Sequence, residues 1–130
     1  MNSYARRKRV EIIKRDQVKP LVSERGEIVR ELASPSIASL RRHSVAEVTI
    51  RPGGGSVPHY HRQAEEVYYI LRGQGQMVLD GEARLVGPGD AVIIPPPAQH
   101  VIHNTGAEEL VMVVTCAPAW SPEDEVPVGG

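Results

Sequence analysis

The chain has 130 residues, of which 41% are hydrophobic and 24% charged, and its formal net charge is -1. This length suits one globular domain and is too short for two full hydrophobic cores. Aromatic residues make up only 4% and phenylalanine is absent, so we expect an aliphatic core. The single Cys116 excludes an internal disulfide, and we find neither a signal peptide nor an apolar run of about 18 residues. We therefore expect a cytoplasmic protein that does not contact membranes.

Positive charge is concentrated near the N-terminus. Residues 1–19 hold seven of the 15 Lys and Arg residues, including the run RRKR. Basic arms often bind nucleic acid, but this run has no interleaved aromatic residues for base stacking, and no DNA-reading motif accompanies it. We interpret residues 1–19 as a solvated basic arm and expect no nucleic acid partner.

Residues 20–117 have the pattern of one all-β domain. Pro20 and Gly26 mark a turn before a first strand. From Ser44 onward, short segments rich in Val, Ile and Tyr are separated by turn residues; in chain order they are SVAEVTI, EVYYIL, QMVLD, ARLV, AVIIP, HVIHN and ELVMVV. Such strands are typical of a sandwich or barrel. The tail, residues 118–130, is rich in Pro and acidic residues, so we expect it to be irregular, with Trp120 as its one anchor.

Two of the expected strands are apolar on both faces. VYYIL and LVMVV lack the alternation of a half-exposed strand, so both of their sides need a cover. One side fills the domain interior, and the chain is too small to cover the other side with helices. We therefore expect a homodimer, in which the segment up to about Ile13 crosses to the partner's sheet as an added strand.

Two of the five histidines stand one residue apart in HYHRQAEEVYYILRG. In an extended strand, residues two apart point to the same side, so His59 and His61 can chelate one ion. The chain then reverses, and Glu66 at the start of the next strand can reach back to the same point. His100 follows a proline-rich bend and can enter the same mouth of the barrel. This donor set suits divalent Mn, Fe, Co, Ni or Zn, and on an octahedral ion it leaves two positions open.

The same residues resemble two motifs of the cupin superfamily. The first motif, G(X)5HXH(X)3,4E(X)6G, is met at every spacing by Gly53, His59, His61, Glu66 and Gly73. The second motif, G(X)5PXG(X)2H(X)3N, is met by Gly89, Pro95, His100 and Asn104. Pro97 stands where the family usually has glycine, a departure that concerns the turn and not a ligand. Fifteen residues separate the two motifs, as in compact microbial cupins.

The resemblance implies a fold and a ligand set. The fold is a double-stranded β-helix, the six-stranded jelly-roll barrel of cupins, and the metal ligands are His59, His61, Glu66 and His100. Glu65 is the alternative carboxylate, but it faces the opposite side of its strand. The flanking segments GEIVREL and CAPAWSPEDE are similar to small single-domain cupins of type 2, which carry the loose label mannose-6-phosphate isomerase-like. That label does not establish an activity.

Other polar residues have weaker assignments. Tyr68 shares the face of the glutamate ligand, so it either offers its hydroxyl to a substrate or simply packs. Gln76 is a second candidate for a polar substrate-binding residue. We interpret His103 as a surface or interface residue and His43 as solvated. Cys116 lacks a reactive pattern and is expected to be a buried, inert thiol.

Three functions fit these observations. The first is an enzyme of dioxygenase or isomerase type that acts on a small oxygen-rich molecule, such as an enediol, keto acid or diol. The alternative is a non-catalytic module that holds a sugar or organic acid at the metal. The third is a structural barrel with an incidental metal. A divalent ion beside one carboxylate keeps a positive charge, which favours anionic or enolate ligands. No catalytic acid or base is assigned.

Overall fold

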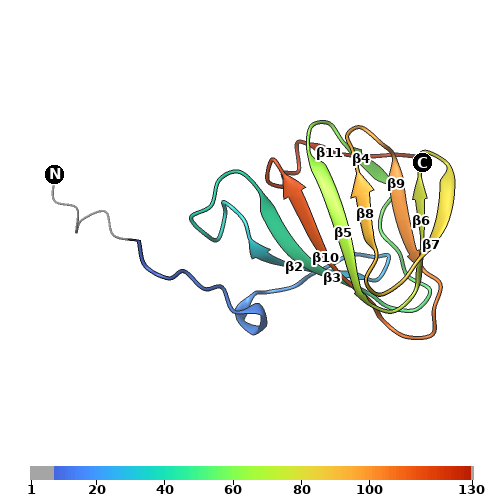
Figure 1. The fold of residues 1–130 in the computed structure, drawn as a ribbon, viewed down its shortest axis with the longest axis horizontal. Coiled ribbons are helices and arrows are strands. Elements are labelled where there is room, and N and C mark those ends of the chain that lie inside the picture. Colours follow the sequence, from blue (N-terminus) through green and yellow to red (C-terminus); the bar gives the residue numbers. More distant parts are fainter. Residues whose placement is uncertain (1–7, 130) are drawn as a thin grey trace.

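The computed structural model describes residues 8–129, so the first seven residues of the basic arm lie outside the described part. Two antiparallel sheets make up the fold (Figure 1). The six-stranded sheet has, in spatial order, β1 (Leu21–Val22), β2 (Glu27–Ala33), β3 (Ser44–Ile50), β10 (Leu110–Ala117), β5 (Glu65–Arg72) and β8 (Ala91–Ile94). The five-stranded sheet has β11 (Glu125–Pro127), β4 (His59–His61), β9 (His100–Asn104), β6 (Gly75–Leu79) and β7 (Glu82–Val86). One 3-10 turn, η2 (Arg15–Gln17), precedes them.

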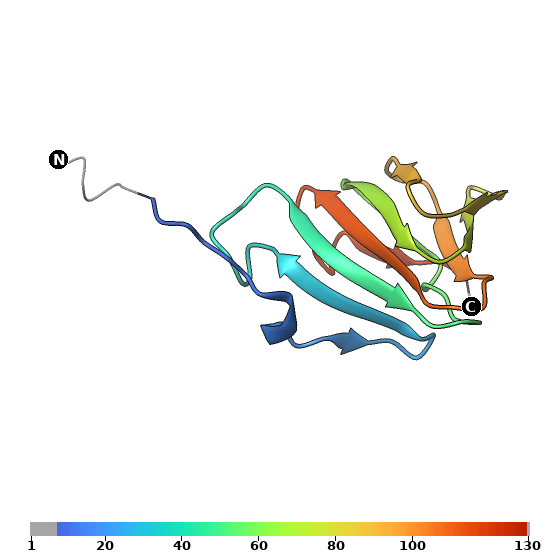
Figure 2. The ribbon, with the colours of Figure 1, turned by 60° about the horizontal axis from the view of Figure 1, so that its bottom comes forward.

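The order of the strands confirms the predicted all-β jelly roll. Figure 2 shows β2, β3, β10 and β5 side by side, although β10 is far from β3 and β5 in the sequence. The buried core is aliphatic apart from Tyr68, as the composition predicts; it includes Ile50, Ile70, Ile94, Ile102, Leu110 and Met112. These side chains come from both sheets, because alternate residues of each strand point inward. All seven segments that were predicted from Ser44 onward form strands.

Two turns show why glycine is needed where it stands. Asp80 and Gly81 both have positive φ, of 45° and 85°, and they form the two-residue hairpin that joins β6 to β7. Gly73, the last residue of the first motif, also has positive φ, and a Cβ there would collide with the backbone carbonyl of Glu109. The motif glycine is therefore required by the close approach of two backbone segments.

The flanks of the domain contribute more structure than the sequence suggested. The described residues contain eleven strands, more than the six implied by the resemblance, and β1, β2 and β11 from the flanks extend the edges of the two sheets. The tail is not irregular throughout: residues 125–127 form β11, which pairs with β4. The reason is tertiary, since the edge of β4 offers backbone partners that a composition rich in Pro and acid does not reveal. Trp120 is held by a hydrogen bond from its backbone N–H to Ser44 Oγ, 2.9 Å.

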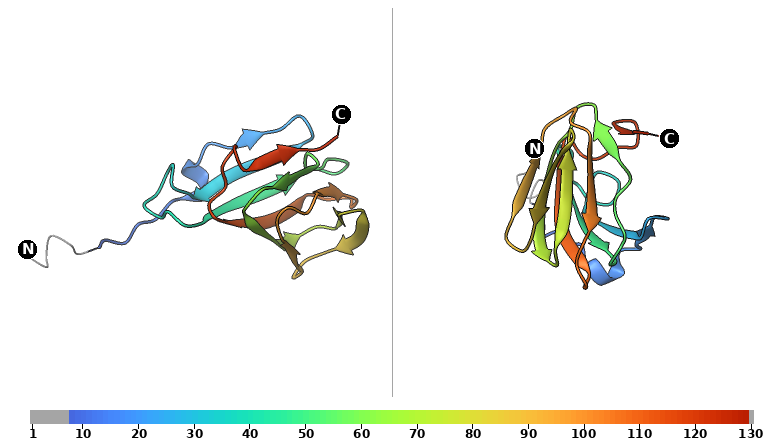
Figure 3. Two further views of the ribbon diagram at one scale, coloured as in Figure 1. Left: turned by 90° about the horizontal axis from the view of Figure 1, so that it is seen from above. Right: turned by 90° about the vertical axis from the view of Figure 1, so that its right-hand side faces the viewer.

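Apolar side chains remain exposed on the outer side of the six-stranded sheet. Tyr69 is 45% exposed on β5, and Ile93 is 66% exposed on the neighbouring β8. Before η2 the chain is extended and leads away from the sheets (Figure 3), and Val10 and Ile12 in this segment are exposed. Within residues 8–129, no helix has the length and apolar character needed to cross a membrane.

Candidate metal centre

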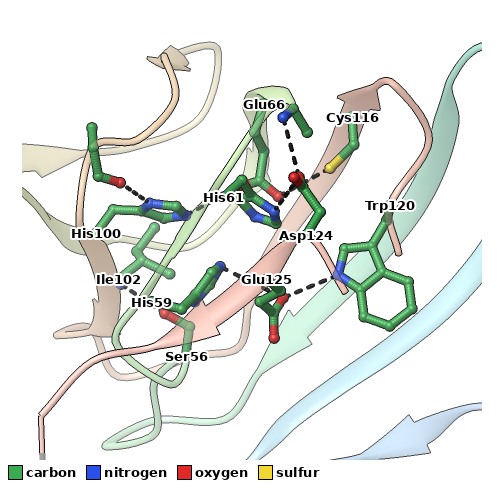
Figure 4. A network of polar contacts seen from close by, with 12 residues as sticks. Ser56, His59, His61, Glu66, His100, Ile102, Cys116, Trp120, Asp124 and Glu125 are labelled. Carbon is green, nitrogen blue, oxygen red and sulfur yellow. Dashed lines mark hydrogen bonds and ion pairs between the residues drawn. The ribbon is translucent and has the colours of Figure 1, made fainter. Parts of the chain in front are cut away.

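Four buried side chains from both sheets converge at one end of the domain. His59 and His61 lie on β4, and His100 lies on β9, where it pairs directly with His59. Glu66 approaches from β5 of the opposite sheet (Figure 4). Each offers one ligand atom, and these four atoms lie within 4.8 Å of one another. This group can hold a metal ion. Glu65 is exposed on the other side of β5, so the carboxylate in the group is Glu66.

Backbone carbonyls orient two of the imidazole rings. His59 Nδ1 lies 2.6 Å from the carbonyl oxygen of Val57, and His100 Nδ1 lies 2.9 Å from that of Ala98. A carbonyl accepts only, so each Nδ1 carries a proton and donates it. In the neutral ring, the lone pair is then on Nε2. This second hydrogen bond of a ligating imidazole is the usual way in which proteins fix the tautomer for metal binding.

Glu66 lies among these rings as a carboxylate. Its Oε1 is 3.0 Å from His100 Nε2 and 3.3 Å from His61 Nε2, and its Oε2 accepts from Cys116 Sγ at 3.3 Å. Burial alone would raise the pKa of Glu66, but the hydrogen bond with His100 and the close His61 ring outweigh it and lower the pKa to about 2. Because His100 Nδ1 already donates, the Nε2 contact with Glu66 requires either a second proton on the ring or a cation.

His61 shows most directly that the site suits a cation. The ring is only 2% exposed, and among the described residues neither nitrogen has a hydrogen-bond partner with suitable geometry. A buried polar group in that state costs about 1–3 kcal/mol. Burial would lower the pKa of His61, but Glu66 outweighs it and raises the pKa above its ordinary value. At His59 burial prevails and lowers the pKa, which keeps the ring neutral. A metal ion bound by Nε2 would satisfy His61 and relieve the pairing with Glu66.

A second set of groups supports the ligands, and the sequence analysis did not identify it. Asp124 accepts hydrogen bonds from the backbone N–H groups of Gln63 (2.8 Å) and Ala64 (3.1 Å), and its Oδ2 lies 3.5 Å from His61 Nδ1. Glu125 accepts from Trp120 Nε1 at 3.0 Å and lies 3.8 Å from His59 Nε2. Both acids belong to the tail, whose acidic run after Trp120 was the only signal in the sequence.

The remaining predicted residues have distinct places. Tyr68 is buried, lines the cavity beside the ligands, and its ring centroid lies 6.1 Å from that of His100. Gln76 does not line this cavity among the described residues: it stands on β6 between the buried Gly75 and Met77, so its side chain faces the other side of the sheet. The expectation that Gln76 contributes to the pocket has to be corrected, because the alternation of β6 is set by the inward Met77.

The three residues given non-catalytic interpretations are also placed. His43 is exposed, and His103 is half-buried on the opposite face of β9 from His100. Cys116 is buried, and burial together with the Glu66 charge raises the pKa of its thiol far above the ordinary value. The thiol therefore stays protonated and serves as a hydrogen-bond donor to Glu66, in agreement with the prediction of an inert cysteine.

Replacing Asp124 with asparagine should weaken metal binding without removing a ligand. The amide keeps the size of the side chain but loses the negative charge near His61 and one of the two acceptors for the turn at residues 63–64. Loss of such supporting contacts typically costs about 10–100-fold in metal affinity. Competition with a chromophoric chelator measures this loss. Glu123→Gln is the matched control, since Glu123 is exposed on the same tail. Equal metal affinities of the two variants would show that Asp124 does not support the site.

Comparisons with known proteins agree with this geometry. The sequence model of the cupin domain family matches residues 46–116. An uncharacterised protein of Methanocaldococcus jannaschii is 39% identical over 109 residues, which cover 84% of this chain and 87% of that protein. A mannose-1-phosphate guanylyltransferase of Escherichia coli is 28% identical, over 85% of this chain but only 24% of its own length. The polyketide cyclase RemF from Streptomyces resistomycificus has a similar fold, with a TM-score of 0.78 and 23% identity over 94% of this chain and 87% of the cyclase chain.

Proposed function

Since this chain belongs to the cupin family, we propose that it is a metal-dependent enzyme of dioxygenase or isomerase type that acts on a small oxygen-rich molecule. His59, His61, Glu66 and His100 would hold one divalent ion of Mn, Fe, Co, Ni or Zn. The observation that carries the proposal is the buried His61 ring, which has no hydrogen-bond partner in the described part of the chain and faces a carboxylate and two oriented imidazoles. Such a group is costly in a metal-free core and favourable around a cation.

The residues beside the ligands determine what chemistry the site could support. A bound divalent ion would supply Lewis-acid or redox chemistry at any position that the protein leaves open. Tyr68 faces the same cavity, and burial, reinforced by the charge of Glu66, raises the pKa of its hydroxyl well above the ordinary value. The hydroxyl thus stays protonated at neutral pH and can donate a hydrogen bond to a substrate oxygen. Cys116 stays protonated as well, so we assign it no nucleophilic role.

A non-catalytic binding module is the second candidate. The relative named mannose-1-phosphate guanylyltransferase favours it, because the segment similar to this chain makes up only 24% of that protein. In that case the metal and cavity would hold a sugar or organic acid without changing it. The two proposals differ in turnover and not in binding.

Elemental analysis of the purified protein, followed by assays of the metal-loaded protein, tests the proposal. Oxygen uptake and product formation are measured with catechols, diketones, keto acids and ketose or aldose sugars. We expect about one metal ion per chain and turnover of at least one compound. Tyr68→Phe should keep the metal and alter the kinetics of that compound. Metal binding with saturable ligand binding but no turnover would favour the binding module, and absence of metal would contradict both proposals.

We also propose that the protein is a homodimer. The outer face around Tyr69 and Ile93 is apolar on β5 and its neighbour β8, and a second copy of the same face would cover it. The extended segment before η2 supports an exchanged arm, because Val10 is 87% exposed and Ile12 is also exposed. Both surfaces would be solvated in a monomer.

Sedimentation equilibrium at micromolar concentration should give twice the chain mass of 14.2 kDa. Ile93→Asp should shift the protein toward the monomer by placing a charge in the apolar contact. Leu85→Asp is the matched control, because Leu85 is also exposed, on β7 of the other sheet, and its replacement should leave the dimer intact. A parent protein that sediments at 14.2 kDa would contradict the proposal.

A further inference from the structure

The cavity next to the metal ligands has an acidic and apolar lining. It has a volume of about 350 Å³ and reaches His59 and Glu66. Its apolar wall includes Val29, Val48, Val57, Ile102, Met112 and Val114. Besides the ligand glutamate, three carboxyl groups line it: Glu27, Glu31 and Glu125. Among the described residues, no lysine or arginine contributes to this lining.

The acidic and basic side chains of β2 lie on opposite faces of the sheet, because successive residues of a strand point to opposite sides. Glu27, Val29 and Glu31 are two residues apart and line the cavity, whereas Arg30 points to the opposite side of the sheet. Arg15, Arg30 and Arg72 line a different hollow, on the outer face, together with Glu47 and Glu109. Cations are therefore available on this sheet, but the fold places them away from the metal ligands.

The extra acids change the charge expected at the site. A divalent ion with Glu66 alone would be net positive and would favour anions, as the sequence indicates. Glu31 and Glu125 add two carboxylates to the lining of the same cavity, and their two negative charges exceed the single positive charge that remains. Because most of the cavity wall is apolar, charges inside it interact more strongly than in bulk water. An anionic ligand would approach without any basic side chain to pair with it.

Glu27 adds a side chain that can form hydrogen bonds with an uncharged hydroxyl or carbonyl group of a ligand. Burial, with contributions from Glu125 and Glu66, raises the pKa of Glu27 to about 7. Its side chain has no hydrogen-bond or ion-pair partner among the described residues; the hydrogen bonds at this residue are made by its backbone, which donates to Ser23 Oγ and accepts from the backbone N–H of Ser23. A carboxyl group that is partly protonated can both donate to a carbonyl and accept from a hydroxyl.

From these observations we infer that the cavity takes an uncharged ligand, with hydroxyl or carbonyl groups on an apolar body, and discriminates against phosphorylated sugars and carboxylic acids. This inference rests on the proposed function, since it assumes that the ligand approaches the metal. The carboxyl groups on β2 and in the tail act as a charge filter, which means that they repel anionic ligands. The apolar wall contacts the body of the ligand.

Calorimetric titration of the nickel-loaded protein tests this inference without turnover. The probes are catechol and 3,4-dihydroxybenzoate, which share one diol and differ by a carboxylate. We expect saturable binding of catechol and at least about tenfold weaker binding of 3,4-dihydroxybenzoate. The double variant Glu27→Gln, Glu31→Gln should reduce this ratio several-fold. Glu47→Gln is the matched control and should leave the ratio unchanged, because Glu47 lines the outer hollow on the same sheet.

Equal or tighter binding of 3,4-dihydroxybenzoate would overturn the inference, as would no saturable binding of catechol at millimolar concentration. The inference would also be overturned if the double variant and Glu47→Gln changed the ratio of the two binding constants by the same factor. Metal content is measured first on each protein. Failure to load nickel would count against the proposed metal centre itself, whereas a loaded protein that prefers the anion would leave the metal centre intact and refute only the charge filter.

Discussion

Replacing His61 with alanine should remove most of the bound metal from the purified protein. The ring is one of the four clustered side chains that we propose as ligands, and it is the one whose two nitrogens lack hydrogen-bond partners among residues 8–129. Since loss of a supporting contact already costs about 10–100-fold in metal affinity, loss of a ligand should cost more than about 100-fold. Elemental analysis after exhaustive dialysis measures the occupancy, and chelator competition measures the affinity.

His103→Ala is the matched control for this variant. The two residues are of the same type and lie in neighbouring strands of one sheet, but His103 faces away from the ligands. The His103→Ala protein should therefore retain the metal content of the parent. Far-ultraviolet circular dichroism should show that both variants keep the β-sheet fold. Retention of stoichiometric metal by folded His61→Ala protein would show that the ion is held elsewhere.

Glu27→Gln should stabilise the metal-free protein at pH 8. The pKa of Glu27 is raised from 4.5 to about 7 mainly by burial, so the folded chain holds this proton more tightly than the unfolded chain does. Below pH 4.5 the Glu27 carboxyl is protonated in both states, so its ionisation has no effect on the free energy of unfolding. The folded protein loses stability as the pH rises from 4.5 to about 7. Glutamine mimics the protonated acid and avoids that loss, which amounts to at most about 3 kcal/mol. The free energy of unfolding by urea, measured at pH 4.5 and 8, gives the difference.

The pH dependence separates this effect from an ordinary change in packing. The gain of Glu27→Gln over the parent should be small at pH 4.5, grow as the pH rises to 7, and stay constant above it. Glu123→Gln, a change at an exposed position, should show no such growth. A gain for Glu27→Gln that is the same at both pH values would mean that the Glu27 carboxyl is not held in a poorly solvated position.

Much of the domain could be predicted because its signals are local. Strands from Ser44 to Ala117 follow from short runs of β-branched residues between turn residues, and the Asp80–Gly81 hairpin is a strong turn signal. The four clustered side chains could be predicted as well. His59 and His61 share a face by the period of a strand, and the spacing of both motifs identifies Glu66 and His100.

The supporting groups could not be predicted, because they depend on contacts between distant segments. Asp124 reaches the turn at residues 63–64 only because β11 pairs with β4, and nothing in the tail composition indicates that pairing. Glu27 precedes the domain's motifs and enters the cavity because β2 lies beside β3. Gln76 was misplaced for a related reason: the face of a short strand beside a glycine turn is decided by which neighbour enters the core, here Met77.

Anomalous diffraction from crystals of the metal-loaded protein tests the central claim most directly. Data collected on both sides of the absorption edge identify the element and locate it. We expect one peak per chain, within about 2.0–2.2 Å of Nε2 of His59, His61 and His100 and of a carboxylate oxygen of Glu66. A peak only at other residues, or no peak in crystals grown with excess metal, would contradict the account.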